Sequence, residues 1–211
     1  MAERMTELDL VVGSMITTTP EEDRDQYEEE RGYVADVQDL LRDEGIEVDL
    51  LSQPGTEVWE GGIDRIYDLY QLQRLAAHLE QGNDVTNLLN ENMDGEDVDD
   101  LLADIWDEEA PTRFPHLIKH QVDGGYYLPV EFAEPIWASD ALEDEDEDDF
   151  EDDEDTSVSF GSSVALVREL TELEGMLQQA NVNQPGVRQA LQVLRDGAQQ
   201  SIQNGLPLIL W

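Results

Sequence analysis

The sequence predicts an α/β or α+β fold, with a small mixed sheet flanked by about five helices and a disordered acidic insertion. Short apolar runs of strand length occur near both ends of the chain, and several longer segments between them repeat apolar residues at helical spacing. Hydrophobic residues make up 39% of the sequence, enough for a sizeable core. The 211 residues fit one domain, residues 1–211, that contains the insertion.

The N-terminal part predicts a strand, a helix and a second strand. Leu8–Met15 is apolar and of the length of a buried strand. Thr19 is a good N-cap for a helix that ends at Asp43, and Gly45 suits its C-terminal cap. Ile46–Leu51 alternates apolar and acidic residues, which predicts a strand with one wet face. This β-α-β outline permits a parallel strand pair.

The middle of the chain predicts a loop, two helices and a hairpin. Glycines and a proline around Trp59 indicate the loop, and apolar periodicity predicts helices at Ile63–Glu80 and Gly95–Glu108. In His116–Phe132, the turn signal Asp123-Gly124-Gly125 between two apolar runs predicts a hairpin. Because Pro129 has no backbone N–H to donate to a neighbouring strand, the second strand is expected at an edge of the sheet.

The last part predicts an acidic insertion, two helices and a strand. Residues 143–155 contain 12 acids in 13 positions, so like-charge repulsion predicts a disordered loop over about 139–158. Helices are expected at Ser162–Gln179, with Ser162 or Ser163 as N-cap, and at Gln184–Gln203. Leu206–Trp211 is apolar and predicts a buried final strand.

The net charge of -41 is the dominant physical property of the chain and is unevenly placed. Residues 1–159 hold 48 acids and eight bases, whereas residues 160–211 hold four acids and three bases. An anionic surface repels phosphates and anionic lipid headgroups, so we expect no direct binding of nucleic acid or membranes. The partners that suit it are cationic: a basic protein, a polyamine or metal ions.

The sequence contains no positive signal for a cellular compartment or for an oligomeric state. No apolar stretch approaches the roughly 20 residues of a membrane span, the N-terminus lacks the features of a signal peptide, and there is no cysteine. We therefore expect a cytoplasmic protein, and the sequence does not indicate its oligomeric state.

Four blocks of the chain together form a recognisable pattern: Tyr67–Glu80, His116–Phe132, Phe160–Leu173 and Ser201–Trp211. They resemble a family of uncharacterised bacterial proteins with an HLxxHxxxxGYYxPVxF segment and a GSSxxLxxEL helix start. Gln121-Val122 stands where that pattern has Ser-Asp, and the acidic insertion is extra. The family has no known activity, so the resemblance implies one continuous domain and no site residues.

One candidate site is a cleft at the predicted hairpin. Histidine is the commonest general base, and a carboxylate can orient it. No nucleophile elbow, phosphate loop or metalloprotease signature accompanies these residues, so no catalytic residue is assigned and an enzyme is disfavoured. The candidate cleft residues are His116, His120, Asp123, Tyr126 and Glu131.

The two histidines are not expected to share a metal. Four positions along a strand separate His116 and His120 by roughly 13 Å, at about 3.3 Å per residue. No metal and no cofactor is therefore predicted. The alternative is structural: one histidine packs against Tyr126 or Tyr127 and the other is exposed.

A second candidate site is an acidic helix face that binds a partner. The helix at 95–108 carries an apolar stripe, Val98, Leu101, Leu102, Ile105 and Trp106, which faces the protein's own core or docks into a partner's groove. A further acidic segment, Glu21–Glu30, begins the first helix. The candidate partner-binding residues are Glu96, Asp97, Asp99, Asp100, Asp104 and Asp107.

Two functions are consistent with these features. The first is a non-enzymatic binding protein that acts on a basic partner, of the immunity or inhibitor type, whose carboxylates imitate DNA phosphates. Such mimicry needs a rigid array of charges, whereas 12 of the acids lie in the insertion, which is expected to be disordered. The alternative is a housekeeping protein adapted to high salt, with a small-molecule, metal or hydrolytic site at His116–Phe132. A single lysine, Lys119, fits that adaptation, and the near-neutral C-terminal quarter does not.

Overall fold

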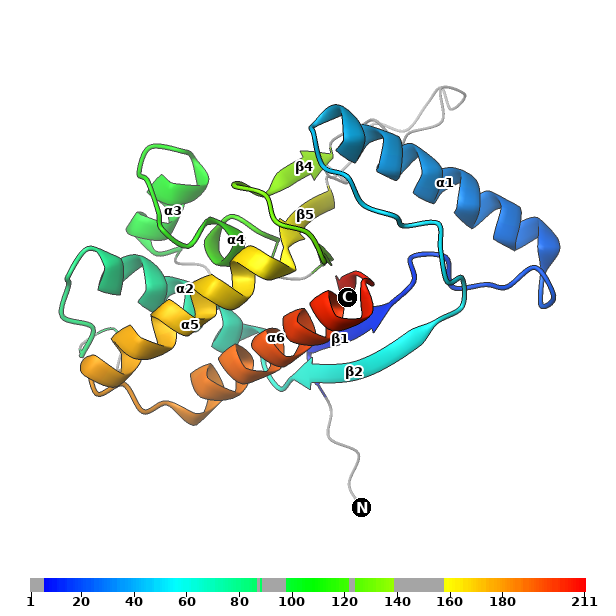
Figure 1. Cartoon of the computed structure of the whole chain (residues 1–211). Coiled ribbons are helices and arrows are strands. Elements are labelled where there is room, and N and C mark those ends of the chain that lie inside the picture. The colour runs from blue at the N-terminus through cyan, green and yellow to red at the C-terminus, as the bar shows by residue number, and fades with distance from the viewer. Residues whose placement is uncertain (1–5, 87, 89–97, 122–123, 139–157) are drawn as a thin grey trace, which may run out of the picture.

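The computed structural model describes residues 6–86, 88, 98–121, 124–138 and 158–211. Six strands form one sheet in the order β2-β1-β6-β3-β5-β4 (Figure 1). Within these residues β3 and β5 pair in parallel, and the other neighbours pair antiparallel, so the predicted small mixed sheet is confirmed. The strands are β1 Leu8–Gly13, β2 Glu57–Ile63, β3 Gly125–Leu128, β4 Ile136–Ala138, β5 Val158–Ser162 and β6 Leu208–Leu210.

Six helices accompany the sheet in the part of the chain that is described. In Figure 1, α5 and α6 run side by side across the sheet, α3 lies at the upper left, and α1 stands apart at the upper right. This arrangement agrees with the expected α+β class. The helices are α1 Arg24–Asp43, α2 Ile66–Glu80, α3 Asp100–Trp106, α4 Pro115–Ile118, α5 Ser163–Gln179 and α6 Pro185–Asn204.

The larger hydrophobic cluster joins the sheet to α2, α5 and α6. Strand β1 contributes Leu8, Leu10 and Val12, and the neighbouring β6 contributes Leu208 and Leu210. These side chains alternate along their strands, as expected when one face of a sheet packs against helices. This cluster buries the apolar faces of these three helices.

A smaller cluster places α1 on the other part of the sheet. Val34, Val37 and Leu41 of α1 are buried in the same cluster as Leu128 of β3 and Phe160 of β5. Helix α1 is therefore fixed to the β3-β5-β4 side of the sheet by its apolar stripe, while its outward face carries acidic residues.

The predicted β-α-β outline is wrong. Ile46–Leu51 forms no strand, and β1 pairs instead with β2, antiparallel, in the segment expected to be a loop. Ile46 and Leu50 are buried beneath α1, so their alternation reflects packing on a helix. In β2, a Cβ at Gly61 would lie 2.3 Å from the Trp59 ring, so this glycine marks a close approach within a strand and not a turn.

The first helix begins later than predicted and ends where predicted. Asp23, not Thr19, is the N-cap: its Oδ1 accepts hydrogen bonds from the backbone N–H groups of Asp25 and Gln26. The helix ends at Asp43, and Gly45 adopts a φ of +80° just beyond it, as its sequence position indicated.

The predicted hairpin at 116–132 is also wrong. His116 lies in the short helix α4, and β3 is the only strand among the described residues of this segment, 116–121 and 124–132. Strand β3 is flanked by β6 and β5, so it is interior to the sheet. Pro129 directly follows the strand, which explains why its missing N–H causes no conflict with the ladder.

The C-terminal predictions are confirmed. Ser162 caps α5 by accepting a hydrogen bond from Ala165 N at 3.0 Å, α6 follows, and β6 is a buried strand at the centre of the sheet. Helix α3 is shorter than predicted, and residues 95–97 lie outside the described ranges. The predicted insertion at 139–158 also falls outside them, apart from residue 158, which begins β5.

Candidate functional site

The imidazole of His116 is fully buried and both of its nitrogens are hydrogen-bonded. Nδ1 accepts from the backbone N–H of Ser162 at 3.0 Å, and Nε2 donates to the carbonyl of Phe132 at 3.0 Å. These partners fix a neutral tautomer protonated at Nε2. Burial lowers the pKa of His116 to about 4.

His120 is buried as well and stacks on Tyr127, with ring centroids 3.9 Å apart. Its two nitrogens face the carbonyls of Gln121 at 2.9 Å and Tyr126 at 3.1 Å. Burial lowers its pKa to about 4. The expected packing of one histidine against a tyrosine is confirmed, and the expectation that the other histidine is exposed is wrong.

Glu169 of α5 binds the start of α4. Its two carboxyl oxygens accept the backbone N–H groups of His116 at 3.2 Å and Leu117 at 2.9 Å, and so satisfy the first donors of α4. Burial raises the pKa of Glu169 to about 8. The Tyr127 hydroxyl donates to the His116 carbonyl at 2.9 Å. Residue-by-residue reasoning missed Glu169, and its only signal was its place in GSSxxLxxEL.

These contacts make the two quoted motifs a structural network. His116 and Tyr127 come from the first motif, and Ser162 and Glu169 come from the second. The network joins α4, β3 and α5 through buried hydrogen bonds, in which both nitrogens of His116 and one nitrogen of the neutral His120 bind backbone groups. It holds the fold together and offers no open acid or base to a substrate.

The four candidate cleft residues that the structure describes do not come together in one cleft. Tyr126 stacks on Phe160 at 5.4 Å, in the region covered by α1, whereas Glu131 lies on the surface and pairs with Arg168 at 2.6 Å. Asp123 is outside the described ranges. Within those ranges, no three His, Asp or Glu side chains are placed to hold a metal ion.

The acidic face of α3 is exposed at three of its candidate positions, Asp100, Asp104 and Asp107. Asp99 lies inside the protein, where its Oδ2 pairs with Nε of Arg74 at 2.6 Å. Burial acts to raise the pKa of Asp99, but hydrogen bonds from Arg74 and His78 outweigh it and lower the pKa. Glu96 and Asp97 lie outside the described ranges.

The apolar stripe of α3 is divided between the core and the surface. Leu102 and Ile105 are buried in the larger cluster, as expected for a stripe that faces its own protein. Trp106 and Val98 remain 38% and 53% exposed. The exposed part of the stripe is therefore Trp106 and Val98.

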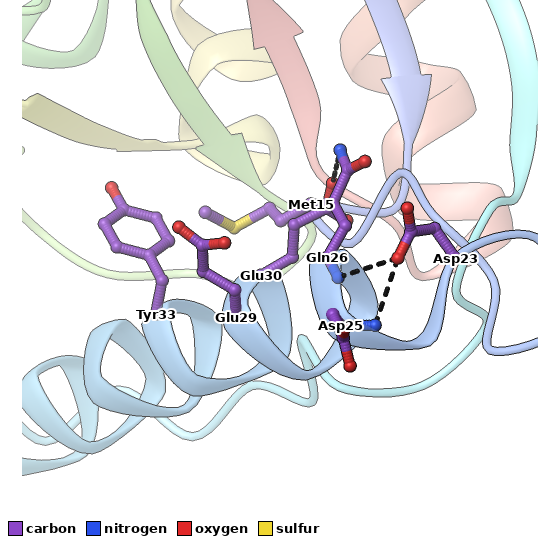
Figure 2. Close-up of a pocket in the computed structure, with 7 residues that line it drawn as sticks. All are labelled: Met15, Asp23, Asp25, Gln26, Glu29, Glu30 and Tyr33. Carbon is purple, nitrogen blue, oxygen red and sulfur yellow. Dashed lines mark hydrogen bonds between the residues drawn. The ribbon is translucent and has the colours of Figure 1, made fainter.

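An acidic groove lies along the start of α1. The groove has a volume of about 650 Å³. Figure 2 shows the acidic side chains spread along the first turns of the helix. Its lining residues are Met15, Asp23, Asp25, Gln26, Glu29, Glu30 and Tyr33. A groove with carboxylates and an aromatic ring suits a cationic side chain.

Several carboxylates of this surface, here called the α1 acidic surface (residues 21–30), are held in fixed positions. Glu30 accepts hydrogen bonds from Thr17, Thr18 and Gln26, and Glu22 accepts from both the N–H and the hydroxyl of Thr19. Hydrogen bonds from Thr19 lower the pKa of Glu22. The helix cap holds Asp23.

The two acidic helices form separate surfaces. Helices α1 and α3 lie apart in Figure 1, on either side of β4. Seven of the ten residues 21–30 are acidic and one, Arg24, is basic, which makes the α1 acidic surface the denser of the two. No helix in the described ranges is long and apolar enough to cross a membrane.

A family model described as "Putative DNA-mimic protein" matches residues 6–210. No curated protein and no solved structure is similar enough to this chain to count as a match. The match covers three of the four blocks on which the resemblance to an uncharacterised family rested in full, and the fourth up to Leu210.

Proposed function

Because the chain belongs to the family described as "Putative DNA-mimic protein", we propose that it binds the DNA-binding surface of a basic protein and blocks it without catalysis. The observation that carries this proposal is the α1 acidic surface, a dense row of carboxylates on an ordered helix start. A partner of this kind presents lysines and arginines to phosphates, and the same side chains would bind carboxylates.

Fixed carboxylates support mimicry more strongly than the net charge does. The phosphates of a duplex occupy regular positions, so a mimic needs charges that do not move away from their partners. Glu22, Asp23 and Glu30 are each tied by hydrogen bonds to neighbouring backbone or hydroxyl groups. The array that binding requires is therefore available outside the acidic insertion.

The charge density of this surface is comparable to that of DNA. An α-helix rises about 1.5 Å per residue, so the first seven residues of α1, 24–30, span roughly 10 Å. They hold four acids, one per roughly 2.6 Å, between the ~1.7 Å of a duplex and the ~3.4 Å of one strand, and three more acids precede them at residues 21–23. Such a field steers a basic partner toward the surface and raises its association rate.

The rest of the molecular surface is not uniformly acidic. Exposed positions of α6 include Arg188, Gln192, Gln199, Gln203 and Asn204. High-salt adaptation acts on every exposed surface, whereas a binding function needs acids only where the partner docks. The neutral surface of α6 therefore favours a localised binding role for the acids.

The proposal is tested by capture from a cell extract on immobilised protein, followed by elution with duplex DNA. Polyglutamate at the same charge concentration controls for plain acidity. We expect a bound protein that DNA releases and polyglutamate releases poorly, and whose DNA complex this chain disrupts in a gel-shift assay. Equal release by both polymers would mean that acidity alone accounts for binding.

Two charge-matched variants locate the binding surface. Glu28→Gln with Glu29→Gln removes two exposed charges from α1, and Glu57→Gln with Glu60→Gln removes two from the edge strand β2. We expect the first pair to reduce capture strongly and the second to leave it nearly unchanged. An equal effect of the two pairs would overturn the assignment to α1.

A further inference from the structure

We infer that a second contact point for the same partner is the hollow between Trp106 and Trp137, and that it accepts an arginine side chain. This inference rests on the proposed function, since it assumes a basic protein partner. The hollow has a volume of about 280 Å³, at the lower limit of small-molecule sites, so its size suits a single side chain. Its lining residues are Trp106, Glu108, Lys119, His120, Gln121 and Trp137.

The two indoles are exposed, and they are set in place by different elements. Trp106 belongs to α3 and is 38% exposed, and Trp137 belongs to β4 and is 47% exposed. The indole N–H of Trp106 donates to the carbonyl of Ile118 at 2.8 Å. The indole N–H of Trp106 is therefore already hydrogen-bonded within the protein, and a partner would contact the apolar part of the ring. Tryptophan in a preformed pocket is typical of the residues that dominate binding energy.

The rim of this hollow carries a surplus of negative charge. Lys119 lies 3.5 Å from Glu134 and 4.0 Å from Glu108, so one ammonium is shared by two carboxylates. Asp104 is exposed on the same helix as Trp106, and Asp107 is exposed at the C-cap of that helix. A cation entering the hollow would meet an aromatic ring and an incompletely neutralised carboxylate together.

Arginine fits this chemistry better than lysine. Its planar guanidinium stacks on tryptophan and can bind a carboxylate through two parallel hydrogen bonds, whereas the ammonium of lysine is compact and strongly hydrated. Surfaces that bind DNA use arginine for both phosphates and bases. Here an indole and a carboxylate would take the places of a base and a phosphate.

The test compares capped hexa-arginine and hexa-lysine peptides, labelled for fluorescence anisotropy, in about 0.15 M salt. We expect the protein to bind hexa-arginine more tightly, and Trp137→Ala to weaken hexa-arginine binding about two- to fivefold while leaving hexa-lysine binding unchanged. Trp211→Ala is the control, because Trp211 is 57% exposed and lies away from the hollow. It should leave both affinities as they are.

Lys119→Gln identifies the charge of the occupant. If the occupant is a cation, removing the competing ammonium strengthens hexa-arginine binding. Weaker or unchanged hexa-arginine binding by Lys119→Gln would overturn the inference, as would a Trp137→Ala variant that keeps the arginine preference of the wild type.

The failure of this inference can be told apart from the failure of the proposed function. Neutralising Glu28 and Glu29 on α1 reports on the proposed function through capture and DNA release. The ratio of the two peptide affinities in Trp137→Ala reports on the hollow alone, because both peptides carry the same charge.

Discussion

The carboxylate of Glu30 on α1 is hydrogen-bonded to Thr18 on the loop that follows β1, which donates both its backbone N–H and its hydroxyl at 2.9 Å. We expect Glu30→Gln to lower the free energy of unfolding by about 1–2 kcal/mol, because hydrogen bonds to a charged acceptor are lost. Urea unfolding of the variant and the wild type measures this difference. Glu29→Gln, an exposed neighbour, should change stability by less than about 0.5 kcal/mol.

The same contact gives Glu30 a defined pH dependence. Burial acts to raise the pKa of Glu30, but hydrogen bonds from Thr18, Thr17 and Gln26 outweigh it and hold the pKa below the ordinary 4.5. The stabilisation is therefore present above pH 4.5 and is lost as the pH falls below it. A Glu30→Gln variant whose loss of stability is equally large well below that pH would contradict this account.

Asp99 provides a second prediction, because it pairs with Arg74 inside the protein and caps α3. Asp99→Asn removes the buried carboxylate charge that pairs with Nε of Arg74, so we expect a loss of about 3 kcal/mol or more. Asp100→Asn is the matched control at an exposed position, with an expected change below about 0.5 kcal/mol. Chemical unfolding measures both free energies. A loss for Asp99→Asn as small as that for Asp100→Asn would mean that the ion pair contributes little to stability.

The buried histidines predict a distinctive titration. Because burial lowers the pKa values of His116 and His120 to about 4, both rings should stay neutral at pH 5, with His116 protonated at Nε2. Nitrogen and carbon NMR shifts of the rings report this directly. A midpoint near the ordinary 6.5 for either ring would refute its burial.

The sign of the effect on stability follows from these values. In the unfolded chain the histidines take up protons near pH 6.5, whereas in the fold they resist protonation down to about pH 4. Each therefore destabilises the fold as the pH falls through this window, by roughly 3 kcal/mol at about 1.36 kcal/mol per pH unit.

Two glycines within helices should respond oppositely to alanine. A Cβ at Gly32 in α1 would meet nothing within 4 Å, so Gly32→Ala should stabilise the protein by about 0.5–1 kcal/mol. A Cβ at Gly197 in α6 would lie 2.9 Å from both Leu208 and Trp59, so Gly197→Ala should destabilise it by about 1–3 kcal/mol. Thermal unfolding of the two variants checks the signs, and a stabilising Gly197→Ala would contradict the close packing of α6.

Salt should stabilise the fold through screening of its net charge of -41. We expect the melting temperature, followed by circular dichroism, to rise between about 0.05 and 0.5 M KCl and then to level off as the Debye length approaches about 3 Å. A continued large gain between about 0.5 and 3 M would instead favour high-salt adaptation. No change over the whole range would contradict a repulsive role for the acids.

The sequence predicted best the elements whose signals are local. Ser162 as the cap of α5 and Gly45 beyond the end of α1 depend on a few adjacent residues. Strand β2 was missed because its glycines are explained only by Trp59 and by the partner strand. The segment at 46–51 was misread because a helix, not a sheet, covers its buried side chains.

The surroundings of the candidate site residues could not be predicted for a related reason. Asp99 is one of several successive acids in the sequence, and only the fold shows that Arg74, 25 positions earlier, draws it inside. The histidines resembled a general base because sequence spacing does not show which backbone groups occupy their nitrogens. The acidic segment 21–30 was recognised from composition alone, but the loop threonines that fix Glu30 were not.

Strand β6 has a consequence for how the chain acquires its fold. It lies between β1 and β3, so residues near position 209 join the β2-β1 pair to the β3-β5-β4 group. Pairing across so much sequence makes folding slow, and until β6 arrives, β1 presents an open edge to other chains. A nascent or refolding chain with this many negative charges repels its own copies. The acids would thus act as a built-in safeguard against aggregation during the period before the sheet closes.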